Sequence, residues 1–282
     1  MRPIKIIVDS TCDLPRDFLD KHQVTILPLG VSFKEESYYD GATITVPELY
    51  KKVEEYKILP KTFALSIQVF SDEFKKWVDE GFDVLFISIS SSLSCCYQNA
   101  LISAQDYNES VKVFDSKSLS TGIGLQVLKA IKARDEGKSL SEIFELLEGY
   151  CPKVRAQFAV ETLDYLFKGG RCSALTFCFG KNLHIRPIIR VSNGKMGVYK
   201  KPRGKMVNAL NELINIFKSD LNNLDEDCVM ITHSLAHESE AYLYEELKKL
   251  IPEEKIMITN AGSVISSHCG KGTIGILYIV KE

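Results

Sequence analysis

IKIIVDSTCD, residues 4–13, is the stretch that decides the fold class of this chain. Its first half is an apolar run of the length that buried strands have, and its second half is polar. Two further apolar runs end in the same way: residues 84–89 lead into SSSLS (90–94), and residues 111–114 lead into DSKS (115–118). The repetition predicts strands whose polar loops lie at one edge of a sheet, where open α/β sheets bind ligands.

Amphipathic helical patterns alternate with these strands and with a further strand expected at residues 24–29. The helical patterns cover residues 16–22, 46–56, 71–80, 97–108 and 123–136. Such alternation predicts a mainly parallel open sheet covered by helices. We assign it to an amino-terminal α/β domain of residues 1–154.

A second α/β domain is expected over residues 155–282, because 282 residues are most naturally divided between two domains. Asn193-Gly194, between two strand-like runs, indicates a hairpin. Strands are expected at residues 156–160, 188–191, 196–199, 229–232, 256–259 and 274–280, and helices at 163–167, 206–219 and 238–250. Two domains predict a cleft between them.

Charge and hydropathy exclude several classes of protein. Thirty-five basic and 37 acidic side chains give a net charge of −2, which argues against a nucleic-acid-binding protein. No apolar run approaches the roughly 18 residues of a membrane span, and no secretory signal precedes the first strand. We therefore expect a cytoplasmic protein without a transmembrane segment.

Two groups of potentially reactive side chains leave open the alternative that the protein is an enzyme. Cys95-Cys96 follows a strand and precedes a helix, where the helix dipole can activate a thiolate, but the arginine of a phosphatase loop is missing. His233 and His237 are four residues apart but lack the glutamate of a zinc protease motif. A hydrolase or transferase that uses these residues stays open, although we expect no catalytic residue, metal or cofactor. The eight cysteines contain no CxxC pair and are expected to be reduced packing residues: Cys12, Cys95, Cys96, Cys151, Cys172, Cys178, Cys228 and Cys269.

Hydroxyl side chains dominate the polar loops, and no acid–base pair stands out among them. Neutral hydroxyls, backbone N–H groups and one histidine can hold a carboxylate without reacting with it. Five of the eight arginines lie between residues 155 and 203, and arginine suits contacts to anions or protein surfaces. Binding of an anion therefore explains the pattern better than catalysis, and a regulatory protein that binds some other small carboxylate is a further alternative.

A series of motifs across residues 4–280 resembles the DegV family in order and spacing. They are VDSTCDLP (8–15), LPL (27–29), PKT (60–62), SSLS (91–94), FDS (114–116), VETLDYLFKGGR (160–171) and HCGKG (268–272). The resemblance implies two α/β domains with a lipid-binding cleft, which hold one long-chain fatty acid with its carboxylate near the domain interface. It also implies that a separate kinase subunit phosphorylates the presented carboxyl group for phospholipid synthesis.

The resemblance also implies the site residues. Thr62 and Ser94 match the hydroxyls that bind the carboxylate, and His268 matches a histidine near the same headgroup. Arg171 matches an arginine at the pocket mouth or at the kinase-facing surface, and Arg203 lies in the same arginine-bearing segment. The sequence departs from the family pattern at Phe63, at Cys95-Cys96 and at Lys271, which change side chains next to the headgroup.

Overall fold

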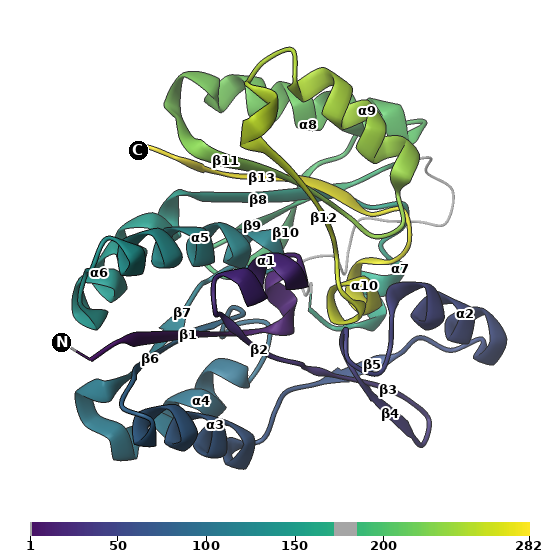
Figure 1. Ribbon diagram of the computed structural model, residues 1–282. Coiled ribbons are helices and arrows are strands. Elements are labelled where there is room, and N and C mark those ends of the chain that lie inside the picture. Colours follow the sequence, from purple (N-terminus) through teal and green to yellow (C-terminus); the bar gives the residue numbers. More distant parts are fainter. Residues whose placement is uncertain (1, 172–184) are drawn as a thin grey trace.

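A computed structural model describes residues 2–171 and 185–282 of the chain (Figure 1). Its lower part is built on a parallel sheet of order β2-β1-β6-β7. The strands are β2 Thr25–Leu27, β1 Ile4–Asp9, β6 Asp83–Ser88 and β7 Val111–Asp115. β1 is buried along its whole length, which explains its nearly continuous apolar sequence. The predicted α/β class, with a parallel first sheet covered by helices, is confirmed.

The second large sheet has the order β10-β9-β8-β13-β11-β12 and forms the upper part of Figure 1. All of its strand pairs are antiparallel except β11–β12. The predicted hairpin joins β9 to β10, and Asn193 and Gly194 both have the positive φ angles that a tight hairpin turn requires. The strands are β8 Val154–Ala159, β9 Ile188–Ser192, β10 Lys195–Lys200, β11 Leu224–His233, β12 Ile256–Asn260 and β13 Ile274–Val280.

Helices cover both sheets. α3 and α4 pack on one face of the parallel sheet and α6 packs on the other, while α8 and α9 cover the outer face of the six-stranded sheet. No helix in the described part of the chain is long and apolar enough to cross a membrane. The helices are α1 Arg16–Lys21, α2 Val46–Tyr56, α3 Ile67–Asp79, α4 Cys96–Ala104, α5 Thr121–Asp135, α6 Leu140–Tyr150, α7 Asp164–Lys168, α8 Met206–Asp220, α9 His237–Leu247 and α10 Ser263–Cys269.

α5 lies between the two sheets and contacts β1 and β6 on one side and β8, β11 and β13 on the other (Figure 1). It is buried almost all round, as its predominantly apolar sequence requires. β13 faces two cores because its side chains alternate. Ile276 and Tyr278 pack under α8 and α9, whereas Leu277 and Ile279 join the core that contains the parallel sheet.

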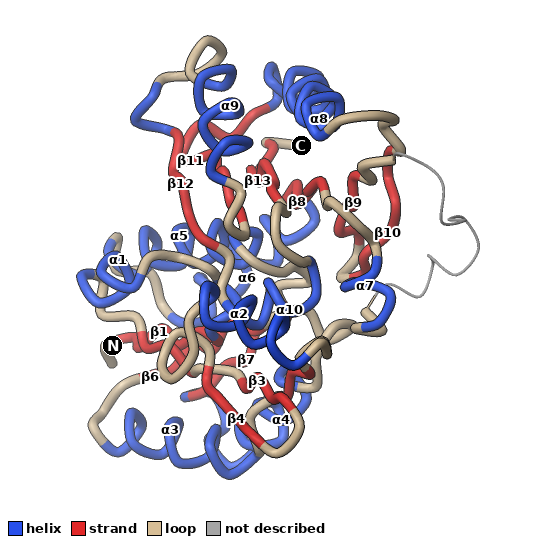
Figure 2. The backbone as a smooth tube through the Cα atoms, turned by 90° about the vertical axis from the view of Figure 1, so that its right-hand side faces the viewer, coloured by secondary structure: helices blue, strands red, loops and turns tan. Residues whose placement is uncertain are grey.

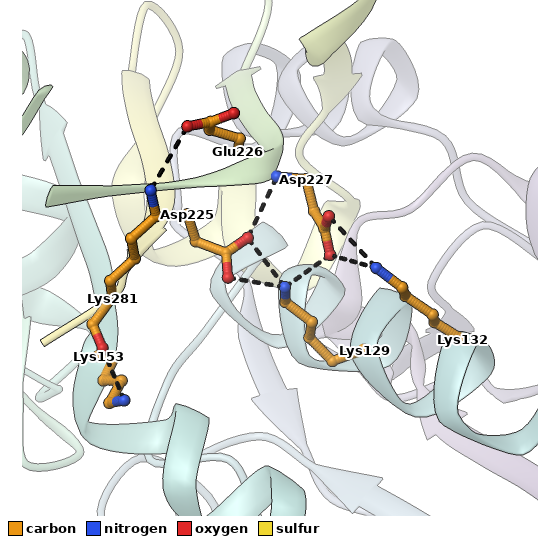
Figure 3. A network of polar contacts seen from close by, with 7 residues as sticks. All are labelled: Lys129, Lys132, Lys153, Asp225, Glu226, Asp227 and Lys281. Atoms are coloured by element: carbon orange, nitrogen blue, oxygen red, sulfur yellow. Dashed lines mark hydrogen bonds and ion pairs between the residues drawn. The ribbon is translucent and has the colours of Figure 1, made fainter. Parts of the chain in front are cut away.

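A network of ion pairs ties α5 to β11 (Figure 3). Lys129 Nζ lies 2.8 Å from Asp225 Oδ2 and 2.6 Å from Asp227 Oδ2, and the Lys129 side chain is only 8% exposed. The pairing of β11 with β13 is irregular between Leu224 and Val229, in the segment that carries both aspartates. The network therefore joins residues that come from the two halves of the chain.

A third sheet was not predicted from the sequence. It is antiparallel, with the order β4-β3-β5, and its strands are β3 Gly30–Phe33, β4 Glu36–Tyr39 and β5 Lys61–Phe63. The strand expected at residues 24–29 covers only Thr25–Leu27 in the structure, and after Pro28 and Leu29 the chain enters β3 at Gly30. Three- and four-residue strands are too short for their periodicity to be recognised.

Two helices were also not predicted. The sequence of α6 is amphipathic and begins with a capping box at Ser139 and Glu142, so this helix could have been predicted from the sequence. α10 has the sequence SVISSHC, which is rich in residues with low helix propensity. It packs against α2, α7 and the small sheet, and Figure 2 shows it near the middle of the molecule.

Candidate functional site

The polar loops that follow β1, β6 and β7 lie side by side. Asp9 Oδ2 accepts a hydrogen bond of 2.7 Å from the N–H of Ile89, which joins the ends of β1 and β6. The Ser91 hydroxyl donates to Asp115 over 2.6 Å, which joins the loops after β6 and β7. Hydrogen bonds therefore connect the three loops at this edge of the sheet, and the buried Ser90 hydroxyl donates to the carbonyl oxygen of Gly194 in the hairpin.

Thr62 and His268 form a direct contact. The Thr62 hydroxyl, on β5, lies 2.8 Å from Nε2 of His268, in the last turn of α10. Both side chains are half-buried. The other ring nitrogen of His268, Nδ1, is buried and has no hydrogen-bond partner among the described residues. A Cβ atom at Gly169 would lie 2.4 Å from this nitrogen, so the ring packs where only glycine leaves room.

His268 is neutral at physiological pH. Burial and the nearby positive charge of Arg171 lower the pKa of the imidazole from 6.5 to about 4. A neutral ring whose Nε2 carries the proton donates to Thr62, and the threonine hydroxyl then keeps its own proton for another acceptor. The pair can therefore donate a hydrogen bond to an anion in the cavity.

Ser94 lies at the start of α4 and lines the same cavity as Thr62 and His268. Its hydroxyl accepts a hydrogen bond of 3.3 Å from the N–H of Cys96, which leaves the hydroxyl proton available. The structure thus brings together the three residues expected to hold the carboxylate, and four of the five expected site residues line this cavity once Arg171 is counted.

The cavity beside these residues has a volume of about 450 Å³, within the range of small-molecule sites. Its polar side chains stand next to exposed lining residues, Phe63, Cys95 and Arg171. A narrow space of about 50 Å³ adjoins it, with a mostly apolar surface that includes the buried residues Phe158, Leu166 and Leu277, although the polar residues Thr232 and His233 also line it. Four residues line both spaces: Leu119, Met196, Ile265 and His268.

The two arginines lie at different places. Arg171 lines the cavity, and its guanidinium donates to the carbonyl oxygens of Gly169 and Leu93 over 2.8 and 3.4 Å. Arg203 is exposed and pairs through its backbone with Ile185, and it lines none of the cavities described here. The structure therefore places Arg171, but not Arg203, beside the hydroxyl pair.

The alternative nucleophiles lie near this cavity. Cys95 is exposed and lines it, whereas Cys96 is buried, and burial raises the pKa of the Cys96 thiol to about 12. A thiol with that pKa is protonated at neutral pH and is a poor nucleophile. Cys172 and Cys178 lie outside the described residues.

His233 and His237 form a cluster with Glu240, a residue that was not considered from the sequence. His233 Nε2 lies 2.8 Å and His237 Nδ1 lies 3.3 Å from the same Glu240 oxygen. These atoms are close enough together for a metal ion. However, His233 Nδ1 accepts a hydrogen bond from the N–H of Ala236, so the proton is on Nε2, the nitrogen that would have to bind the metal. The observed contacts instead give both ring nitrogens of the buried His233 a hydrogen-bond partner.

A larger cavity, of about 740 Å³, lies between the hairpin, β7 and α6. Its lining includes the charged residues Asp115, Glu148, Arg155 and Arg190. It contains none of the five residues predicted from the sequence to form the site. The smaller cavity, with its polar entrance and apolar interior, is therefore the candidate site.

The fold and the cavity define an α/β protein with an internal site that is polar at one end and apolar at the other. The chain belongs to the DegV family: the family model described as "Uncharacterised protein, DegV family" matches residues 3–281. A DegV domain-containing protein of Clostridium acetobutylicum is 36% identical over 284 residues, with all of both chains covered. One from Clostridium perfringens is 31% identical, with 99% of each chain covered.

Solved structures of the family share the fold. A DegV family protein from Thermus thermophilus, described by its fatty acid binding, matches with a TM-score of 0.93 and 30% identity, covering 99% of this chain and 100% of that one. DegV of Bacillus subtilis, described as a fatty acid binding protein, matches with a TM-score of 0.88 and 26% identity over the full length of both. A stearic acid-binding protein from Eubacterium ventriosum matches with a TM-score of 0.85 and 28% identity, over 99% of this chain and 98% of that one.

The apolar lining was missed from the sequence. Leu119, Met196 and Ile265 come from three distant segments, and each was indistinguishable from an ordinary core residue. Of the polar loops recognised in the sequence, the loop after β6 contributes Ser94 to this cavity, whereas Asp115 and Ser118 of the loop after β7 line the larger cavity.

Proposed function

We propose that this protein binds one long-chain fatty acid, with the carboxylate at Thr62, Ser94 and His268 and the acyl chain along the apolar side chains that line the rest of the cavity of about 450 Å³. The observation that carries the proposal is the Thr62–His268 pair at the head of a cavity whose deeper wall is apolar. The relatives described as fatty acid binding proteins support it.

The headgroup would be held by neutral donors. The hydroxyls of Thr62 and Ser94 donate to the carboxylate, and His268 orients the Thr62 hydroxyl by donating to it from Nε2. Arg171 adds a positive charge at the same end of the cavity. Because a buried carboxylate without hydrogen bonds would cost several kcal/mol, these donors decide where the charged end lies.

The acyl chain supplies most of the affinity. Burial of roughly 14 methylene groups, at about 0.8 kcal/mol each, contributes on the order of 10 kcal/mol before the costs of association. Leu119, Met196 and Ile265 connect the two parts of the cavity and would contact the chain where it turns inward.

We propose further that the chain consists of two domains that meet at this cavity, with the boundary near residue 154. β8 begins at Val154, and the other five strands of the six-stranded sheet follow it in the sequence. Thr62 and Ser94 come from the first domain and His268 from the second. The ligand would then lie at the domain interface.

We also propose that the bound carboxylate is presented to a separate kinase subunit. The exposed lining residues Phe63, Cys95 and Arg171 stand at the carboxylate end of the cavity, so a partner could approach this end. This protein would supply no catalytic residue, and the fatty acid would be its only ligand.

Extraction of the purified protein with organic solvent, followed by mass spectrometry, tests the proposal. A long-chain fatty acid at one molecule per chain is expected. A short polar acid would favour the regulatory alternative, and turnover of ester or phosphate substrates in a parallel assay would favour a hydrolase. Protein that contains no fatty acid and fails to take up added palmitate would contradict the proposal.

A further inference from the structure

The DSTCD loop after β1 has no direct part in the proposed binding site, yet its last residue reaches α10. Asp13 Oδ1 accepts a hydrogen bond of 2.8 Å from the N–H of Gly262, the residue immediately before α10. Asp13 is 5% exposed, and its other carboxylate oxygen accepts from the hydroxyl of Ser120. It has a positive φ of 52°, which the turn at the end of the loop imposes.

Asp40, just after β4, holds the next N–H group of the same helix. Its Oδ1 accepts a hydrogen bond of 2.6 Å from the N–H of Ser263, and its Oδ2 accepts one of 3.0 Å from the hydroxyl of Ser10. Asp40 is also 5% exposed. Two buried carboxylates from the first half of the chain thus bind consecutive N–H groups at the start of a helix in the second half.

Gly262 makes this arrangement possible. A Cβ atom at position 262 would lie 2.8 Å from Asp40 Oδ2 and 3.2 Å from Asp13 Oδ1, so any side chain would displace a carboxylate. The φ of Gly262 is −69°, which other residues adopt easily, so the glycine is needed for space and not for its backbone conformation.

The helix depends on these contacts from outside. α10 has seven residues, rich in serine and β-branched side chains, and a helix this short is unstable by itself. Carboxyl oxygens at a helix start satisfy N–H groups that have no partner within the helix. At the other end of α10, His268 contacts Thr62.

We propose that Asp13 and Asp40 are positioning residues for fatty acid binding: by holding the start of α10 they place His268 against Thr62. The proposal rests on the proposed function, because it assigns these aspartates an indirect role in the same headgroup site. Neither side chain lines the cavity. Their effect must therefore pass through the residues that they hold: α10 for both aspartates, and for Asp13 also Ser120, which lines the inner space.

Alanine variants of the two aspartates test the proposal. Asp13→Ala and Asp40→Ala should each weaken palmitate binding about 10-fold or more, whereas Asp40→Asn keeps an acceptor for Ser263 and should stay within about 3-fold of wild type. Ser139→Ala is the matched control, because Ser139 caps α6 away from the cavity. It removes the cap of a helix that does not touch the cavity and should leave palmitate affinity unchanged.

A spectroscopic measurement separates positioning from general destabilisation. In ligand-free protein with ¹⁵N-labelled histidine, the His268 Nε2 signal should shift in both alanine variants, because its hydrogen bond to Thr62 is lost, and should not shift in Ser139→Ala. Gly262→Ala keeps both aspartates but removes the space that their carboxyl groups need. It should therefore also shift the His268 Nε2 signal. This variant replaces an aspartate variant that does not fold.

Unchanged palmitate affinity and an unchanged His268 signal in Asp13→Ala, Asp40→Ala and Gly262→Ala would overturn the inference. An equal loss of affinity in Ser139→Ala would also overturn it, because the effect would then be general. A wild-type protein that binds no fatty acid would instead contradict the proposed function. The His268 signals of the ligand-free variants would still decide whether the aspartates position α10.

Discussion

Thr62 Oγ1 and His268 Nε2 lie 2.8 Å apart although 206 positions separate the two residues in the sequence. The contact joins the edge of a three-stranded sheet to the last turn of a seven-residue helix. It places both side chains on the wall of the cavity that Ser94 also lines.

Removal of either headgroup hydroxyl should weaken fatty acid binding. Thr62→Val and Ser94→Ala should each reduce palmitate affinity by about 1–3 kcal/mol, or about 5- to 150-fold, because a buried carboxylate loses a donor. Isothermal titration calorimetry measures the loss. Ser91→Ala is the control, since Ser91 lies in the same loop but bonds to Asp115 outside the cavity. A double variant, Thr62→Val with Ser94→Ala, that binds palmitate like wild type would contradict the assigned headgroup site.

His268 should make the protein less stable in acid. Its pKa is lowered from 6.5 to about 4 in the folded state, so the unfolded chain takes up a proton that the folded protein does not. The stabilisation is fully present above pH 6.5 and is lost as the pH falls toward 4. Urea unfolding at pH 7 and pH 4.5 should show a larger loss for wild type than for His268→Gln. Because all other groups titrate in both proteins, equal losses would show that His268 has an ordinary pKa.

The Lys129 network should stabilise the fold. Lys129→Ala should lower the free energy of unfolding by roughly 1–3 kcal/mol, because it removes charged hydrogen bonds from Asp225 and Asp227 at a buried position. Lys132 contacts the same Asp227 from a side chain that is 60% exposed, so Lys132→Ala should cost less than about 1 kcal/mol. Denaturant unfolding of both variants measures the difference, and equal effects would contradict a special role for the buried lysine.

The two adjacent cysteines should differ in reactivity. Iodoacetamide at pH 8 should modify Cys95, which is exposed. It should leave Cys96 unmodified, because burial raises the pKa of the Cys96 thiol to about 12. Bound palmitate should slow the modification, since Cys95 lines the cavity. Peptide mass spectrometry identifies the modified residue. Cys95→Ala should load palmitate normally, and a covalent acyl adduct on either thiol would support the enzyme alternative.

Charge reversal should separate binding from presentation. Arg203→Glu should reduce phosphorylation of bound fatty acid by a kinase subunit from the same organism more than it reduces fatty acid loading, whereas Arg171→Glu, at the carboxylate end of the cavity, should reduce both. Arg16→Glu is the control, because Arg16 is exposed on α1 and lines none of the cavities described here. Normal phosphorylation of both variants would place the kinase-facing surface elsewhere.

Local sequence patterns were sufficient to predict those helices and strands whose hydrophobic pattern extends over several residues. The apolar runs of β1, β6 and β7 and the periodicity of α2 and α5 predicted a parallel sheet covered by helices. Asn193-Gly194 predicted the hairpin because few other residues tolerate two successive positive φ angles. These signals depend on neighbouring residues only, so they can be recognised in a single sequence.

The residues of the candidate site were proposed from a family resemblance, and only the tertiary structure decided how they lie. Thr62 belongs to a three-residue strand that exists because it pairs with β3, and His268 belongs to a helix held by Asp13 and Asp40. Neither element has a local signal strong enough to predict it, since its stability comes from partners up to 249 positions away. The sequence alone determined the sheet and its polar edge, whereas the contact between Thr62 and His268 arose only when distant segments packed together.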